Sequence, residues 1–227
     1  MLSIIIPVLN EAESIGKHLQ QLTTLISGQA EIIVVDGGSR DNTLDIVSQY
    51  DVKIINSASG RARQMNAGAV VATGDTLLFL HADTILPAMV PNMFLNILPN
   101  PVPTICQWGF FKVRLSGQHW MYRVIESMIN LRSSLTSVAT GDQCIFVARD
   151  LFEKLHGYKD IPLMEDVELS KRLKLLYKPH VIKQAVTTSS RRWEHNGIVA
   201  TIILMWRIRF LYFMGVSPKQ LAKLYVS

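Results

Sequence analysis

The first third of the chain alternates between short apolar runs rich in β-branched residues and longer segments with helical spacing. The apolar runs predict strands at residues 2–6, 31–35, 52–55 and 76–80. The segments between them predict helices at residues 12–26, 42–49 and 62–72. Strands and helices that alternate through short loops are typical of a mostly parallel sheet with helices on both faces, so we expect an α/β fold.

The pattern is less regular in the second half. It predicts strands at residues 108–115, 143–148 and 185–190. It predicts helices after Pro87 and at residues 119–131, 150–155 and 165–175, and a last short helix that begins at Ser217-Pro218. No internal repeat or low-complexity linker divides the chain. We therefore expect one domain over residues 1–227, made of an N-terminal half (1–85), a second half (86–196) and apolar C-terminal helices (197–227).

One segment, residues 197–214, is strongly apolar and is broken only by Arg207 and Arg209. Its uninterrupted apolar stretch is shorter than the roughly 20 residues that a bilayer span requires. Two interpretations stay open. The segment is a helix buried in a core or a homodimer, or it lies in a membrane interface with its arginines facing lipid phosphates.

Composition narrows the classes of function. With 48% hydrophobic and 18% charged residues, the chain is not disordered. The net charge of +5 suits an anionic membrane surface or a phosphorylated substrate, and the basic residues form no long run, so we expect no nucleic-acid partner. Cys106 and Cys144 are too few for a disulfide framework. The first apolar run is too short for a signal peptide, so we expect a cytoplasmic chain, either free or peripheral on the inner face of the membrane.

Polar side chains gather where the predicted strands of the N-terminal half end. Glu11 follows the first strand, Asp36 the second, and His81 and Asp83 the fourth. Ligands of open α/β sheets bind beyond these carboxyl ends. Asp83 is placed to hold a divalent cation together with substrate phosphates, or to cap a following helix, and spacing alone leaves both interpretations open.

Two further groups of residues suggest chemistry in the second half. Glu165 and Asp166 open a predicted helix, where acids either favour the helix dipole or supply a general base. Arg192 and Trp193, after Arg191, suit a diphosphate and a sugar or apolar acceptor, or else form a solvated basic turn with a core tryptophan.

The order of these motifs resembles the family 2 glycosyltransferases. The segments that carry the resemblance are IIIPVLNE (4–11), IVVDGGSRDNT (33–43), NAG (66–68), FLHAD (79–83) and MED (164–166). The short chain, with SRRW (190–193) and GVSP (215–218), is similar to a small subgroup called radical-SAM/selenodomain-associated transferase 2. The resemblance covers nearly the whole chain.

This resemblance implies a GT-A fold and inverting transfer from a nucleotide-diphospho-sugar, with a UDP-sugar as the first expectation. It implies that Asp83 meets a divalent cation, Mn²⁺ or Mg²⁺, and that Asp166 is the catalytic base, with Glu165, Arg192 and Trp193 beside it. The acceptor is not specified, and the apolar C-terminal segment favours a lipid-linked one. The residues expected to bind the nucleotide are Pro7, Glu11, Asp36, Arg61 and His81.

Two positions depart from the family pattern. Gly37 stands where the family usually has a second acid after Asp36, and His81 stands where it has the first acid of Asp-x-Asp. These departures support an alternative, a catalytically silent nucleotide-sugar-binding or membrane-surface scaffold protein. The sequence lacks the motifs of two other enzyme classes. A nucleotidyltransferase would need a glycine-rich loop after the first strand, and a dinucleotide-dependent dehydrogenase would need G-x-G-x-x-G.

Overall fold

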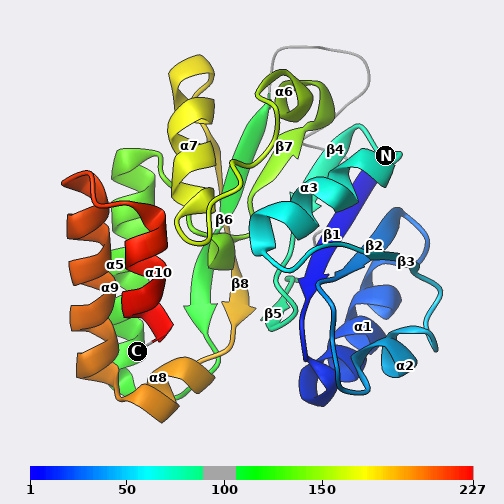
Figure 1. Ribbon diagram of the computed structural model, residues 1–227, viewed down its shortest axis with the longest axis horizontal. Coiled ribbons are helices and arrows are strands. Elements are labelled where there is room, and N and C mark those ends of the chain that lie inside the picture. Colours follow the sequence, from blue (N-terminus) through cyan, green and yellow to red (C-terminus); the bar gives the residue numbers. More distant parts are fainter. Residues whose placement is uncertain (89–105, 227) are drawn as a thin grey trace.

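One mixed sheet runs through most of the chain in the computed structural model, which describes residues 1–88 and 106–226 (Figure 1). Within these residues the sheet has eight strands in the order β3-β2-β1-β4-β7-β6-β8-β5. The strands are β1 (Leu2–Val8), β2 (Ala30–Asp36), β3 (Lys53–Asn56), β4 (Thr76–Phe79), β5 (Thr84–Ile85), β6 (Trp108–Leu115), β7 (Phe146–Ala148) and β8 (His180–Thr188).

Helices follow most of the strands along the chain. Those of the N-terminal half are α1 (Ala12–Ile26), α2 (Thr43–Val47) and α3 (Arg61–Val71). Those of the second half are α5 (Trp120–Thr136), the 3₁₀ turn η1 (Gly141–Gln143), α6 (Arg149–Lys154) and α7 (Glu165–Leu176). The C-terminal helices are α8 (Arg191–Asn196), α9 (Ile198–Phe213) and α10 (Pro218–Val226).

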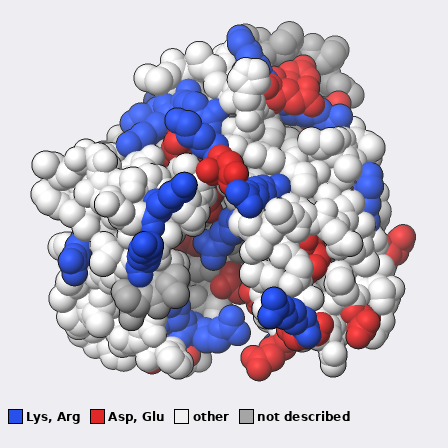
Figure 2. All heavy atoms as spheres, viewed as in Figure 1, with Lys and Arg blue, Asp and Glu red and all other residues white. Residues whose placement is uncertain are grey.

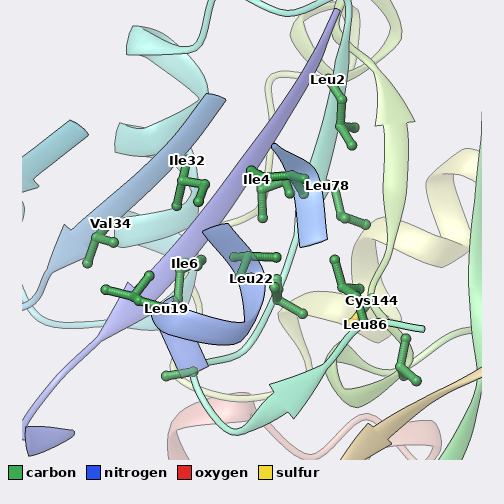
Figure 3. Packing of buried hydrophobic residues seen from close by; sticks show 14 of the residues in the cluster. Leu2, Ile4, Ile6, Leu19, Leu22, Ile32, Val34, Leu78, Leu86 and Cys144 are labelled. Atoms are coloured by element: carbon green, nitrogen blue, oxygen red, sulfur yellow. The ribbon is translucent and has the colours of Figure 1, made fainter. Parts of the chain in front are cut away.

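Strand β1 supplies side chains to both faces of the sheet because successive residues of a strand point to opposite sides. Ile4 and Ile6 pack with Leu19 of α1 on one face (Figure 3). Ile5 joins the core on the other face, which α3, α6 and α7 cover. Burial of each large aliphatic side chain is worth about 1.5–3 kcal/mol, so the alternation fixes the register of the central strand.

The first four strands bring their carboxyl ends to one edge of the sheet. β1 pairs in parallel with β2 and β4, and β2 pairs in parallel with β3. Antiparallel pairs then join β4 to β7, β6 to β7, and β5 to β8, while β6 and β8 are parallel. The expected sheet with helices on both faces is confirmed, and most of its described pairings are parallel.

Helix α5 is held against β6 by polar side chains. Asn130 accepts a hydrogen bond from the backbone nitrogen of Val113 and donates one to its carbonyl oxygen, both at 2.9 Å. Glu126 accepts a hydrogen bond from the backbone nitrogen of Leu115 at 2.6 Å. These hydrogen bonds pair backbone groups of β6 next to a register shift between β6 and β8. They also fix the rotation of α5 about its own axis.

Some predicted boundaries are wrong. β8 begins at His180 rather than at residue 185, because its first part sets the adjacent apolar Val181 and Ile182 between exposed polar residues and so shows no strand alternation. Helix α5 continues to Thr136, five residues beyond its predicted end. Asp83 runs directly into the short strand β5 rather than into a helix, so it does not act as the helix cap considered for it. The helix expected after Pro87 falls largely on residues 89–105, outside the described residues.

Among the helices in the described part of the chain, none combines the length and apolarity needed to cross a membrane. The apolar segment at residues 197–214 forms α9, which packs on α8 and α10. Only Thr201 and Ile208 of α9 are buried. The interpretation of this segment as a buried core helix is therefore wrong.

Candidate active site

A cavity of about 820 Å³ lies between the carboxyl edge of the N-terminal strands and the helices α5, α7, α8 and α9. Most of the residues singled out from the sequence line it, although they come from both halves of the chain. They are Glu11, Arg61, His81, Asp83, Glu165, Asp166, Arg192 and Trp193. Pro7 and Asp36 do not line it.

The carboxylate of Asp166 is held in one orientation at the start of α7. Its Oδ2 accepts a hydrogen bond from the backbone nitrogen of Gly141 at 2.7 Å, and its Oδ1 accepts one from that of Val167 at 2.6 Å. Burial raises the pKa of Asp166, and these two hydrogen bonds oppose the shift without cancelling it. A fixed carboxylate with a raised pKa has the properties of a general base.

Glu165 is buried beside Asp166 at the first position of α7. Burial, and then repulsion from Asp166, raise the pKa of Glu165 to about 7, while Arg61 acts in the opposite direction. The two neighbouring carboxyl groups titrate as a pair, because ionising one makes it harder to ionise the other.

Gly141 lets the side chains of His81 and Asp166 approach its backbone closely. A Cβ atom at this position would lie 2.5 Å from the Cε1 and Nε2 atoms of His81 and 3.7 Å from Oδ2 of Asp166. Desolvation, and then the charge of Arg61, lower the pKa of His81 to about 3, so its imidazole is neutral at physiological pH. The histidine in place of the family's first acid therefore packs against the turn that holds Asp166.

Arg61 reaches into the same cavity from the first residue of α3. Desolvation lowers the pKa of its guanidinium, but Tyr225, Glu165, Asp166 and Asp83 raise it to a net value above the ordinary one. Arg61 forms no hydrogen bond or ion pair with another described residue. Its charge is available to an anionic ligand at the junction of the two halves.

Asp36 builds the loop after β2. Its carboxylate accepts hydrogen bonds from the backbone nitrogens of Gly38, at 2.8 Å, and Ser39, at 3.0 Å, and from the Ser39 hydroxyl at 2.5 Å. Pro7 pairs with Val35 within the sheet. The nucleoside contacts expected for Pro7 and Asp36 stay predictions.

The glycine after Asp36 has a packing explanation. The amide of Gln64 is buried and donates to the carbonyl oxygens of Val8 and Val35, both at 2.8 Å, so it ties β1 to β2 where they end. A Cβ atom at Gly37 would meet this amide at 3.0 Å. The family's usual second acid would therefore crowd Gln64, which accounts for the departure by local packing.

Arg192 is oriented by the last helix. Its guanidinium lies 3.6 Å from the ring centroid of Tyr225 and donates a hydrogen bond to the Tyr225 carbonyl oxygen at 3.1 Å. Trp193 packs against a small core cluster that includes Leu115 and Tyr122. Both residues lie in the helix α8 rather than in a turn, and their contacts with a ligand stay predictions.

Sequence reasoning missed several residues of the cavity. Arg132 enters from α5, Asp142 from η1, Arg209 from α9 and Tyr225 from α10. The acid next to Gly141, just before a strand, was a signal that could have pointed to Asp142. Arg132 carried no such signal, because it lies in an amphipathic helix where an arginine is ordinary.

The described residues contain no group of three or more His, Cys, Asp and Glu side chains that could hold a metal ion. Asp83 lines the cavity, and its carboxylate accepts one long hydrogen bond from the Thr84 hydroxyl at 3.3 Å. One carboxylate fits a cation that arrives with phosphate ligands of its own, as Mg²⁺ commonly does.

Comparison with known proteins identifies the family. The model of glycosyl transferase family 2 matches residues 3–155. The chain belongs to this family. One relative is the probable glycosyltransferase YdaM of Bacillus subtilis, 27% identical over 94% of this chain and 54% of that protein. This chain spans about a third to about half the length of the curated relatives it matches.

Solved structures show the same fold. S. aureus TarS 1–349 in complex with UDP-GlcNAc matches with a TM-score of 0.67 and 19% identity, over 83% of this family 2 chain and 58% of TarS 1–349. The mannosyltransferase PcManGT from Pyrobaculum calidifontis, in complex with GDP-Man and Mn²⁺, matches with a TM-score of 0.60 and 19% identity, over 83% and 56%. The expected GT-A fold is confirmed. The resemblance to the radical-SAM-associated subgroup stays a prediction.

Proposed function

We propose that this chain transfers a sugar, with inversion, from a nucleotide-diphospho-sugar to an acceptor hydroxyl. One observation carries the proposal: the fixed carboxylate of Asp166 lies in the same cavity as Asp83 and Arg61 of the other half. In this arrangement residues 1–85 bind the donor nucleotide, residues 86–196 supply the base and the acceptor site, and residues 197–227 close the cavity.

The reaction is a single displacement at the anomeric carbon. Asp166 takes the proton of the acceptor hydroxyl as its oxygen bonds to that carbon, and the bond from the carbon to the diphosphate oxygen breaks on the opposite side. Arg61 and Arg192 neutralise the negative charge that builds on the leaving diphosphate. A divalent cation held by Asp83 and the diphosphate would supply further charge stabilisation.

The donor site is tested by nucleotide binding. Purified protein is titrated with UDP, GDP and CDP and their sugars, with and without Mn²⁺ or Mg²⁺, and the melting temperature is recorded. TarS and PcManGT, which were solved with UDP-GlcNAc and GDP-Man, motivate the panel. We expect a metal-dependent rise in melting temperature with one nucleotide class, UDP first. The nucleotide affinity derived from this rise should fall at least about tenfold in Asp83→Ala and stay unchanged in the exposed control Asp51→Ala.

Two outcomes would count against this function. If no nucleotide shifts the melting temperature, the donor site is wrong. If the nucleotide-sugar binds but is neither transferred nor hydrolysed, the alternative of a catalytically silent binding or scaffold protein gains.

Trp206 of α9 lines the cavity and also belongs to an exposed apolar surface, which supports a lipid-linked acceptor and peripheral membrane contact. Helix α9 exposes a stripe at helical spacing, Val199, Ile203, Trp206, Phe210 and Phe213. Residues 197–227 contain four basic residues and no acid. Figure 2 shows the side where α9 lies as mostly uncharged surface interrupted by Lys and Arg. Two such faces brought together in a homodimer would place like charges near each other, whereas an anionic membrane complements them.

Membrane contact predicts charge-dependent binding to vesicles. The chain should sediment with vesicles of phosphatidylcholine and phosphatidylglycerol and much less with phosphatidylcholine alone. Phe210→Glu places an acid on the exposed stripe and should reduce the bound fraction at least about tenfold. Val70→Glu, at an exposed apolar residue of α3, is the matched control and should bind like the unaltered chain. A stable dimer that Phe210→Glu dissociates, with no vesicle binding, would instead establish the homodimer.

A further inference from the structure

Two oppositely charged side chains in the cavity have polar atoms that no described residue satisfies. Nε and Nη2 of Arg132 and Oδ1 of Asp142 are buried, and each lacks a hydrogen-bond partner within the described residues. Both side chains line the cavity. Buried polar atoms are nearly always paired in native proteins, so each of these calls for a partner beyond the described residues, such as a ligand in the cavity.

The protein holds these two side chains near each other without letting them pair. Their neighbours in sequence, Ser133 and Gln143, are both buried, and the Gln143 amide donates to the Ser133 hydroxyl at 2.9 Å. This bond ties η1 to α5. Even so, Arg132 and Asp142 do not come within the 4.0 Å of an ion pair, as the ion pairs of the described residues show. Space for another group therefore lies at this point of the cavity wall.

The charges around this space determine which kind of ligand it can hold. The charges of Asp142 and Asp166 oppose the lowering of the Arg132 pKa by burial. The charge of Asp83 adds to the rise in the pKa of Asp142 that burial causes. An anion beside Arg132 would meet these carboxylates, and a cation beside Asp142 would meet the guanidinium. A neutral polyol avoids both conflicts, because each hydroxyl can accept from an arginine and donate to a carboxylate.

The position of the pair relates it to the reacting atoms. Asp142 directly follows Gly141, whose backbone nitrogen binds the carboxylate of Asp166. A sugar that offers its hydroxyls to Arg132 and Asp142 would therefore lie beside the base. Its ring would be fixed by two directional contacts that are independent of the nucleotide.

We propose that Arg132 and Asp142 form a clamp for sugar hydroxyl groups that sets the sugar specificity of the transfer. This inference rests on the proposed function. It assigns recognition of the sugar hydroxyl groups, which the nucleotide site does not contact. The hydroxyls belong either to the sugar of the donor or to a sugar of the acceptor, and separate titrations with donor and acceptor sugars distinguish these sources.

The test compares sugar binding with nucleotide binding in the same protein. Calorimetric titrations measure Kd for UDP and for UDP-glucose, UDP-galactose and UDP-N-acetylglucosamine, with GDP and GDP-mannose in parallel. A second series adds methyl glycosides to protein saturated with UDP. The variants are Asp142→Asn, which keeps the size of the side chain but removes its charge, and Arg132→Lys, which keeps the charge but removes the guanidinium donors. The control is Asp150→Asn, at an exposed residue of α6.

The clamp predicts that both variants bind UDP as the unaltered protein does. If the clamp reads the donor, their affinity for the preferred UDP-sugar falls about 10- to 100-fold, the effect of a lost charge-assisted hydrogen bond. If it reads the acceptor, donor affinities hold and the preferred methyl glycoside loses affinity by a similar factor. Unchanged affinity for every sugar, with UDP still bound, would overturn the clamp and leave the proposed function standing. Absence of UDP binding in the unaltered protein would overturn the proposed function itself.

Discussion

Asp166→Asn is expected to lower kcat by about 10²–10⁴-fold, the usual contribution of a positioned general base, while nucleotide-sugar affinity changes by no more than a few-fold. The asparagine keeps the size of the side chain, and its carbonyl oxygen can still accept the hydrogen bond from Gly141. The substitution removes the ability to take a proton. An effect on kcat with little effect on donor binding identifies an interaction that matters in the transition state.

The measurement is release of the nucleoside diphosphate, with acceptor extracts or with water as the acceptor. Glu153→Gln removes an exposed acid of α6 and serves as the control. Comparable turnover by Asp166→Asn and the unaltered protein would exclude Asp166 as the base and shift attention to Glu165.

The same base should give a characteristic pH dependence. Burial raises the pKa of both Asp166 and Glu165, the latter to about 7. A base works only when ionised, so kcat should begin to fall at a pH above the range of an ordinary carboxyl group. A profile that stays flat down to pH 5 would contradict the raised pKa values.

The N-terminal half could be predicted closely because its signals are local. β-branched runs and helical spacing placed β1, β2, β4 and α1 within a few residues of their observed bounds. Parallel strands then bring the residues after their carboxyl ends to one edge, which is why Glu11, His81 and Asp83 meet in one cavity.

The second half was harder because its structure depends on contacts between distant segments. The first part of β8 has polar residues on both sides of Val181 and Ile182 and pairs with β6 next to a register shift, so it has no simple alternation. The position of Arg132 beside Asp142 depends on the hydrogen bond between Ser133 and Gln143, which joins a helix to a turn and cannot be foreseen from the local sequence. The neutral state of His81 likewise results from desolvation and Arg61, neither of which spacing reveals.

Gly141→Ala should reduce kcat by about 10²-fold, although it adds a single methyl group. The new Cβ would lie 2.5 Å from the His81 ring, closer than real Cβ contacts allow, so the ring or the turn must move. Movement of the turn displaces the backbone nitrogen that orients Asp166. A shift of about 1 Å in a catalytic group can cost about 10²-fold in rate. The φ angle of Gly141 is not positive, so backbone strain does not account for the loss.

A double-mutant cycle with His81→Ala separates this mechanism from general damage. Removing the imidazole makes room for the added methyl group, so Gly141→Ala should cost no more than a few-fold when His81 is already alanine. The two substitutions would then be strongly non-additive, as expected for groups in direct contact. Rates of nucleoside diphosphate release from the four proteins, with melting temperatures as a check on folding, complete the cycle. If the two losses simply multiply, Gly141 acts on Asp166 by a route that does not pass through His81.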